Sequence, residues 1–564
     1  MITNFEELLI CKQKENKSRL PFQIGVDLYT NRKPVHYKNL KIFYTGYFFN
    51  FDELNKKRFA KVEDFLGDFY LNKSTDQLIA SLEGYYSVVI IENEKITILI
   101  DKYGVESGYY LKPKHSSGFI FSTSLKLLHT AHSLSLSRNS IANYLLFEDL
   151  PEGETLFDEI YKIKRGECVV FDVHSLEIKT IQTNRYFDAN NQNGTKADND
   201  IIIEMETLLV KQFKELHSNM PDIEVWNQLS GGVDSSLLQV LLSKIGYNKS
   251  YCANLSGYGM DGQYSVEVAN HLKCEHRVFE YSIDEIKADM EKGIHSLFSP
   301  CIYVGESMFY RSFKELSGTE PSLCISGNGA DALFGHGQVL KVLKLYQMFP
   351  ALFGNLFRLA SNRMKKFDFI RFIYPEIRKE QFVLAAFSNT LAKDLFTDEQ
   401  LVREAVAKKA DEVFRTDGSM MECVYASQVY FGEVSRQNPV IYKLAKMNNV
   451  MLRFPYIQED FVSFLMRIPV GQKLKRFENK YYAKKYLEKY LPKTLIYRKK
   501  QGKQMQWEYL FTEQSKVSVT KFVKTELNGI LKEDVIEHCY GKSGYEGLSL
   551  KLLNLYKLHQ TLRV

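Results

Sequence analysis

The stretch Val225–Leu238 most constrains what this chain can fold into. Its first half is an apolar run typical of a buried strand, its middle is a turn of small polar residues, and helical periodicity follows from Leu237 onward. Ser230, Gly231 and Gly232 let the backbone approach a phosphate and point N–H groups at it, while the new helix presents its positive N-terminal end. The stretch therefore predicts a phosphate-binding loop, although a plain helix start capped by Ser and Asp is the simpler alternative.

Polar side chains open the helix that follows this turn. Asp234 offers a carboxylate to a metal ion, and Ser235 and Ser236 offer hydroxyls to phosphate oxygens. The motif resembles the pyrophosphatase loop of ATP-pyrophosphatases, the superfamily that includes asparagine synthetase, GMP synthetase and tRNA-thiolating enzymes. Such enzymes adenylate a carbonyl oxygen and release pyrophosphate. The resemblance implies that ATP binds at Leu229, Ser230, Gly231, Gly232, Asp234, Ser235 and Ser236.

Length and charge set the class of protein. With 564 residues the chain is too long for a single domain with one hydrophobic core, since a domain has about 150 residues on average. Residues of hydrophobic type make up 45%, enough for a globular protein with substantial cores. The net charge of +6 is small against 74 basic and 68 acidic residues, so nucleic acid is not expected as a partner.

The N-terminus and the cysteines indicate a compartment. No basic segment followed by an apolar one opens the chain, and no uninterrupted apolar run reaches about 18 residues, so we expect neither secretion nor a membrane partner. The eight cysteines are scattered without a Cys-x-x-Cys pattern, which fits reduced thiols and gives no sign of zinc. We therefore expect a cytoplasmic protein.

Residues 1–188 are rich in strand-like runs separated by short polar turns. The runs are Lys41–Phe49, Tyr85–Glu92, Ile96–Ile100, Gly118–Ser122 and Glu167–Phe171. Four stretches resemble class II glutamine amidotransferase domains, at 46–54, 82–111, 121–127 and 155–166. The resemblance implies an α+β, antiparallel-sheet domain of the Ntn type over residues 1–188.

The chemistry of such a domain is missing from this chain. Class II glutaminases attack with the thiol of a cysteine that follows the initiator Met, and here that position is Ile2. The asparagine that helps to stabilise the oxyanion is replaced by Thr45. Removal of a propeptide could expose Cys11 instead, but the sequence around it lacks the Cys-Gly-Ile context. We expect a structural relic or a surface that docks a partner protein, and no glutaminase activity.

A boundary is predicted at Ala189–Asp200, a polar segment without hydrophobic periodicity. From Ile201 to the end at Val564, helical patterns alternate with short apolar runs, as expected for a doubly wound parallel sheet in an α/β fold. Expected elements are helices at 201–217 and 235–245 and strands at 222–229, 249–255 and 322–325. Sites in such sheets lie beyond the carboxyl ends of the strands, which is where the loop at 230–236 falls.

A second loop, Ser326–Gly337, resembles the Ser-Gly-Glu-Gly-x-Asp-Glu-x-Phe-Gly-Gly motif of asparagine synthetases. In this loop Asp331 can pair with Asp234 to hold Mg²⁺ against pyrophosphate, and the backbone at Ser326 and Gly327 can contact the nucleotide. Asn328 occupies the position of the catalytic glutamate of that family. Since an asparagine cannot accept a proton, the role of that glutamate cannot be carried over.

The C-terminal third resembles asparagine synthetases in two further segments. Asn448–Pro469 is similar to the segment that packs beside the ATP site, and the resemblance implies a catalytic role for its retained Arg453. Asn479–Tyr490 is similar to the helix with the catalytic lysine, which places Lys480 at that position. A solvated basic face is the alternative for Lys480. Residues 338–420 show helical periodicity without a readable motif, and the leucines of 548–562 predict an amphipathic helix that packs into the core.

Three functions follow from these features. The first is an ATP-dependent and Mg²⁺-dependent amide ligase that joins a carboxylate to an amine of the same small molecule or peptide. β-Lactam synthetases and lasso-peptide macrolactam synthetases, which this chain resembles in type, combine an inert amidotransferase domain with a working synthetase domain. The second is asparagine synthesis from free ammonia. The third is a non-catalytic scaffold of a biosynthetic complex, against which the retention of both Asp234 and Asp331 counts.

Overall fold

The structure is a computed structural model of the chain. It describes residues 9–13, 27–29, 35–51, 54, 59, 61–93, 95–111, 118–172, 175, 177–182, 196–258, 261–318, 322–349, 379–388, 392–415, 418–498, 510–539 and 545–563. Within these ranges no helix combines the length and the apolar composition that are needed to cross a membrane.

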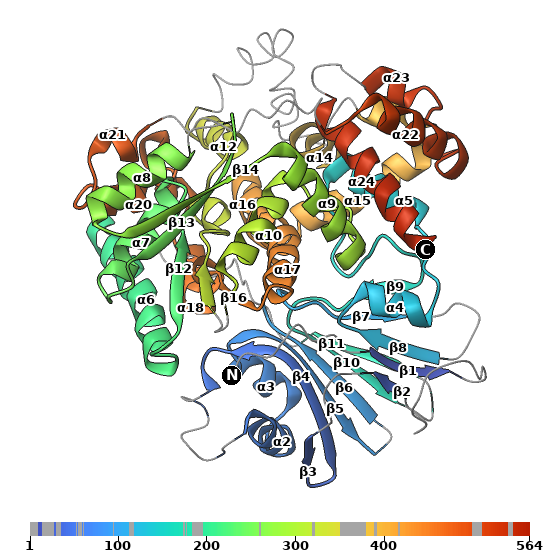
Figure 1. The fold of residues 1–564 in the computed structure, drawn as a ribbon, viewed down its shortest axis with the longest axis horizontal. Coiled ribbons are helices and arrows are strands. Elements are labelled where there is room, and N and C mark those ends of the chain that lie inside the picture. The colour runs from blue at the N-terminus through green and yellow to red at the C-terminus, as the bar shows by residue number, and fades with distance from the viewer. Residues whose placement is uncertain are drawn as a thin grey trace.

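The N-terminal part is built on two antiparallel sheets (blue to cyan in Figure 1). Its strands are β1 Leu9–Gln13, β2 Asp27–Tyr29, β3 Val35–Tyr37, β4 Leu40–Phe48, β5 Gly84–Glu92, β6 Lys95–Ile100, β7 Tyr109–Leu111, β8 Gly118–Ser122, β9 Ile160–Lys162, β10 Glu167–Asp172 and β11 Ile178–Gln182. Among the described residues one sheet has the order β2-β1-β8-β7-β9 and the other β11-β10-β6-β5-β4-β3. The strands predicted from the sequence are confirmed, with ends that differ by at most one residue.

Successive side chains of β5 point into two different hydrophobic cores, one on each face of its sheet. Val89 belongs to the core that also holds Phe121 of the other sheet, whereas Val88 and Ile90 belong to a core with Leu66. Leu66 lies on α2 Val62–Asn72. The other helices of the N-terminal part are α3 Thr75–Ser81, α4 Leu125–Ala131 and α5 Arg138–Phe147. Successive side chains of a strand point to opposite faces, so β5 is buried on both. The predicted α+β antiparallel-sheet domain is confirmed.

The second part contains a parallel sheet covered by helices on both faces (Figure 1). Its strands are β12 Glu224–Gln228, β13 Lys249–Leu255, β14 Glu275–Tyr281, β15 Ser322–Ile325 and β16 Val450–Arg453. Among the described residues their order is β14-β13-β12-β15-β16, so the strand order reverses between β12 and β15. Ligands of doubly wound sheets bind at such a reversal, beyond the carboxyl ends of the strands. Both predicted loops follow these two strands.

Helices of the second part cover the sheet and continue to the C-terminus. They are α6 Asp198–Asn219, α7 Val233–Ser243, α8 Asp261–Leu272, α9 Ile283–Leu297, α10 Val304–Leu316, α11 Ala330–Leu333, α12 Gln338–Met348, α14 Lys379–Phe387, α15 Glu399–Val413, α16 Met420–Phe431, α17 Glu433–Lys446, α18 Glu459–Met466, α19 Val470–Lys473, α20 Tyr481–Leu487, α21 Lys493–Ile496, α22 Glu513–Glu526, α23 Val535–Cys539 and α24 Glu546–Leu562. Successive side chains of β12 pack into two different hydrophobic cores, one on each face of the sheet, with Val225 in one and Trp226 in the other.

The predicted linker differs from the structure at one end. Residues 183–195 lie outside the described residues, but α6 begins at Asp198, within the predicted linker Ala189–Asp200. Asp198 and Asp200 stand in the first turn of α6, where acidic side chains interact favourably with the helix dipole. The last three residues of the predicted segment therefore belong to α6, because its polar composition also suits a helix start.

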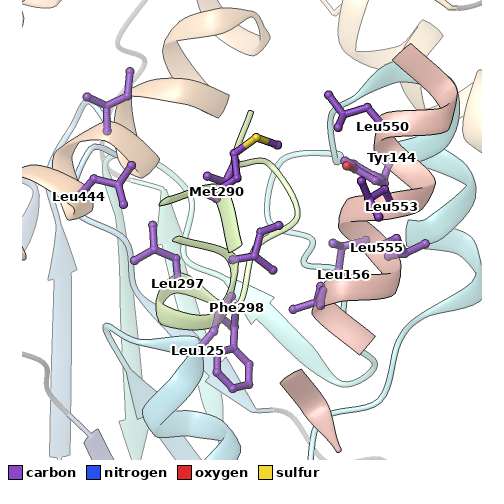
Figure 2. Close-up of a cluster of buried hydrophobic side chains, with 14 of the residues drawn as sticks. Leu125, Tyr144, Leu156, Met290, Leu297, Phe298, Leu444, Leu550, Leu553 and Leu555 are labelled. Carbon is purple, nitrogen blue, oxygen red and sulfur yellow. The ribbon is translucent and has the colours of Figure 1, made fainter. Parts of the chain in front are cut away.

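The C-terminal helix α24 joins the two parts into one core. Figure 2 shows Leu550, Leu553 and Leu555 of this helix beside Tyr144 of the N-terminal part, with Met290 of α9 in the same cluster. The prediction that the C-terminal leucines pack into the core is confirmed. A core shared in this way fixes the N-terminal sheets against the helices of the parallel sheet.

Candidate functional site

The two predicted loops lie against each other beyond β12 and β15. A Cβ atom added to Gly327 would lie 3.4 Å from the Cβ of Asp234. Ser326 donates a hydrogen bond from its hydroxyl to Gln228 Oε1 at 3.4 Å, which ties the second loop to the end of β12. The fold therefore brings together residues that are about 95 positions apart in the sequence.

The first loop has the form of an anion cradle. The N–H of Ser230 donates to Ser235 Oγ at 3.1 Å, and the N–H of Gly232 donates to Ser230 Oγ at 3.4 Å. Gly232 caps α7 without a side-chain hydrogen bond, so the N–H groups of the first turn face the open end of the helix. The hydroxyl of Ser236 is buried and makes no hydrogen bond within the described part of the chain. These donors suit phosphate oxygens.

Gly231 makes this cradle possible, and it supports a first prediction. Its φ is +69°, and an added Cβ would lie 2.6 Å from the carbonyl carbon of Tyr264. Gly246 also has a positive φ, of +94°, but an added Cβ would meet nothing within 4 Å. Gly231→Ala should therefore weaken ATP binding by about tenfold or more, whereas Gly246→Ala should cost about 1–2 kcal/mol of stability and leave ATP affinity unchanged. Equal ATP affinity of the two variants in a nucleotide titration would contradict the cradle.

Lys480 connects the two loops. Its ammonium contacts Asp234 Oδ2, and it lies 2.5 Å from Asp331 Oδ1, so one cation lies between both carboxylates. Burial would lower the pKa of Lys480, but the charges of Asp234 and Asp331 outweigh it and hold this pKa above its ordinary value. Lys480 caps α20 with a φ of +58°, a conformation that is uncommon for lysine and that turns its side chain into the site.

The pair Asp234 and Asp331 fits a divalent ion. The ammonium of Lys480 stands where a metal would be shared, which shows that both carboxylates reach a single cation. No group of three or more His, Cys, Asp or Glu that could hold a metal occurs among the described residues. Magnesium commonly uses one or two carboxylates and takes its other ligands from water and substrate phosphates. The donor set is therefore suitable for Mg²⁺ bound together with a nucleotide.

Asn328 belongs to a network of neutral polar groups. Its Oδ1 accepts a hydrogen bond from Ser326 Oγ at 3.3 Å, and its Nδ2 donates to Asn438 Oδ1 at 3.2 Å. Asn438 lies on α17 and is fully buried. Asn328 thus ties the second loop to α17 and offers no group that could take a proton.

Two predicted site residues point elsewhere. Arg453 donates to the carbonyl of Gln212 at 3.4 Å, and its guanidinium lies 4.4 Å from the ring centre of Phe49 in the N-terminal part. Burial lowers the pKa of Arg453. Leu229 is fully buried, and its N–H donates to the carbonyl of Tyr251 at 2.7 Å. The structure thus places Arg453 between the two parts of the chain and Leu229 in the core, and it brings neither side chain to Lys480.

Three residues at the loops had no sequence signal that singled them out. Tyr456 donates from its hydroxyl to the carbonyl of Asp234 at 2.8 Å, and Arg498 donates to the carbonyl of Gly231 at 3.2 Å. The guanidinium of Arg498 also lies 3.7 Å from the ring centre of Tyr264. Arg498 lies outside the segments that the sequence analysis singled out, so only the fold identifies it.

The surroundings of Thr45 are filled by the second part of the chain. Thr45 is buried and donates a hydrogen bond to Glu106 Oε2 at 3.0 Å. Lys446 of α17 donates to the same oxygen at 2.6 Å and to Thr45 Oγ1 at 3.4 Å. An ion pair between the two parts thus occupies the position where the sequence predicts the loss of an oxyanion donor.

Comparisons with known proteins agree with this arrangement. The sequence model of the asparagine synthase family matches residues 215–558, and that of the glutamine amidotransferase domain matches residues 25–187. Asparagine synthetase (glutamine-hydrolyzing) 1 of Bacillus subtilis (strain 168) is 22% identical over 518 residues, which cover 85% of this chain and 78% of the relative. A putative asparagine synthetase (glutamine-hydrolyzing) of Mycobacterium tuberculosis (strain ATCC 25618 / H37Rv) is 22% identical over 394 residues, 65% of this chain and 58% of the relative.

Among solved structures, the NH3-dependent NAD synthetase from Campylobacter jejuni subsp. jejuni NCTC 11168 is similar over 40% of this chain and 98% of its own. The sequence identity is 17% and the TM-score is 0.20, so this similarity carries no argument about function.

Proposed function

The chain belongs to the asparagine synthase family, and on that premise we propose that it is an ATP-dependent ligase that forms an amide within one substrate. In the proposed reaction a substrate carboxylate attacks the α-phosphate of ATP, pyrophosphate leaves, and an amine of the same small molecule or peptide displaces AMP. The observation that carries this proposal is Lys480, whose ammonium is held at once by Asp234 and Asp331 from the two loops.

Each group in the site has a part in this proposal. The N–H groups of Gly232 and of the first turn of α7 would bind the pyrophosphate, since they form an anion cradle. Asp234 and Asp331 would hold Mg²⁺, which would neutralise the charge of the leaving pyrophosphate. Lys480 would then move from the carboxylates to the α-phosphate, because the metal takes its place between them. There it would stabilise the negative charge that develops when the carbonyl is attacked.

The amine is proposed to come from the substrate itself, because both routes for ammonia are altered. Glu106 and Lys446 form an ion pair beside Thr45, and Thr45 donates to Glu106, so no oxyanion donor for glutamine is left at this position. Asn328 is bound to Ser326 and Asn438 and cannot deprotonate an incoming amine. When the amine belongs to the same substrate, its effective concentration at the activated carboxylate is high, which can replace part of the catalysis that a glutamate at position 328 would supply.

A second prediction concerns glutamine. Purified protein should release no glutamate from glutamine, because Ile2 offers no thiol and Thr45 is engaged. The alternative nucleophile Cys11 lies in β1, where its register partners are Asp27 of β2 and Ile120 of β8. The measurement is glutamate release with Cys11→Ala as the control. Clear turnover that is lost in Cys11→Ala would refute the proposal that this domain is inert.

The substrate class is tested by product mass. An intramolecular amide makes the product lighter than the substrate by one water, whereas synthesis from ammonia converts aspartate into asparagine. The protein is incubated with ATP and Mg²⁺ and either a candidate peptide or aspartate with ammonium, followed by mass spectrometry. Loss of water from the peptide supports the proposal. Asparagine formation alone would favour the ammonia-dependent alternative.

A further inference from the structure

A cavity of about 180 Å³ lies between the two parts of the chain, apart from the loops described above. One wall comes from the N-terminal part, with Tyr109 of β7 and Lys162 of β9, and another comes from α17 with Arg436 and Lys443. The family comparisons and the proposed reaction assign it no role. We infer that this cavity is a binding site for a small organic anion with an apolar body, a carboxylate or a phosphate.

Paired strands point two polar side chains in the same direction. Tyr109 and Lys162 are direct partners in the antiparallel pair of β7 and β9, so their side chains share a face of the sheet. Lys443 approaches from α17 and donates to Tyr109 Oη at 3.4 Å and to the carbonyl of Thr123 at 2.9 Å. Two ammonium groups from different parts of the chain thus converge on one phenol.

The local charge favours an anion. Burial would raise the pKa of Tyr109, but the ammonium groups of Lys443 and Lys162 lower it below its ordinary value. Burial lowers the pKa of Lys162, the nearby Tyr109 and Asp149 oppose that shift, and the charges of Lys443 and Arg165 add to it. Among the described residues no ion pair joins Lys162 or Lys443 to a carboxylate, so an anion in the cavity would supply the missing countercharge.

Acidic residues of the wall are paired with other basic side chains. Glu148, Asp149, Glu152 and Glu154 each form an ion pair with a basic side chain other than Lys162 or Lys443, at 2.6 to 3.3 Å. Of these four, only the charge of Asp149 also raises the pKa of Lys162. Ser107 also lines the cavity, is 1% exposed, and its hydroxyl interacts with the phenol of Tyr109 and helps to lower the pKa of that phenol. The cavity therefore holds hydroxyl and ammonium groups that can donate hydrogen bonds to a ligand oxygen.

The rest of the wall sets the size and the body of the ligand. Leu125, Leu156, Phe298 and Val440 also line the cavity and give its wall an apolar part. Sites for drug-sized molecules measure roughly 300–1,000 Å³, so this cavity suits a smaller metabolite. Because both parts of the chain form the walls, a bound ligand should also stabilise their contact.

The inference is tested on the full chain with phenylacetate and phenyl phosphate as anionic probes and phenylacetamide as the neutral control. Isothermal titration should show that at least one anion binds with a dissociation constant of about 1 mM or lower, and about tenfold or more tightly than phenylacetamide. The same anion should raise the melting temperature. Comparison of the two anions tells whether the site prefers a carboxylate or a phosphate.

Variants locate the binding. Lys162→Met and Lys443→Met should each weaken binding of the anion by about tenfold or more, and Lys162→Arg should retain it. Loss of an unpaired ammonium should not unfold the protein, which the melting temperature of each variant checks. Lys521→Met, on the exposed face of α22, is the matched control and should bind as wild type does. Binding that is unchanged in both cavity variants, equal binding of phenylacetamide, or no binding of either anion at millimolar concentration would overturn the inference.

Discussion

Asp234→Asn is expected to lower the formation of AMP and pyrophosphate by about 10³-fold or more, because it removes a charged ligand of the proposed metal. Asp331→Asn should have an effect of the same order, since Asp331 contacts the same ammonium at 2.5 Å. The fold should survive either change, because Lys480 keeps one carboxylate partner and so does not become an unpaired buried charge.

Steady-state assays of pyrophosphate release would test this expectation, with the melting temperature as a check of folding. Asp284→Asn is the matched control, because the Asp284 side chain is 94% exposed on α9 and its pair with Lys287 is a weak surface contact. Near-normal activity of Asp234→Asn would show that the two loops do not form a shared cation site.

Lys480→Ala should lower amide formation by about 10²–10³-fold, the usual loss when one group that stabilises an oxyanion is removed. ATP binding should remain nearly intact, since the cradle at Ser230–Gly232 is unchanged. Removal of the ammonium also leaves Asp234 and Asp331 facing each other without a cation. We therefore expect Lys480→Ala to bind Mg²⁺ as tightly as wild type or more tightly, which distinguishes a role on the substrate from a role in holding the metal.

Asn328→Ala is the informative companion to that variant. It loses hydrogen bonds to Ser326 and Asn438 but no charge, so its effect should be far milder. Lys485→Ala, on the same helix as the capping Lys480 and paired with Glu488 at 2.8 Å, controls for general damage to α20. Product formation and nucleotide binding are measured for the three variants. An inactive Asn328→Ala beside a nearly active Lys480→Ala would show that the catalytic group has been assigned to the wrong residue.

Much of the fold followed from local patterns. Strands such as β5 and β13 carry apolar runs because both of their faces are covered, so their ends could be predicted closely. β14 was missed, because Glu275–Tyr281 alternates charged and aromatic residues at the edge of the sheet and shows no apolar run. The short strands β7 and β9 were missed as well, since three residues carry no readable period and depend on their partners.

Local motifs also predicted the loops, but not what surrounds them. Ser230 and Asp234 lie within one turn and helix start, so their chemistry can be read from adjacent residues. Lys480 is 246 positions from Asp234, and its resemblance to a family motif suggested a catalytic role but not the contact with Asp234 that the fold shows. Tyr456 lies in the family-like segment Asn448–Pro469 but was not singled out there, and Arg498 lies outside such segments. Arg453 shows the opposite limit, because its place in a motif did not reveal that its side chain lies against Phe49.

The nucleotide product tests the central proposal most directly. The two loops and Lys480 predict attack at the α-phosphate, so wild-type protein supplied with ATP, Mg²⁺ and a substrate that it converts should form AMP and pyrophosphate in equal amounts with the amide. Phosphorus NMR or chromatography of the quenched reaction distinguishes these products. ADP and inorganic phosphate as the products would contradict the proposal, because they would mean that the reaction occurs at the γ-phosphate.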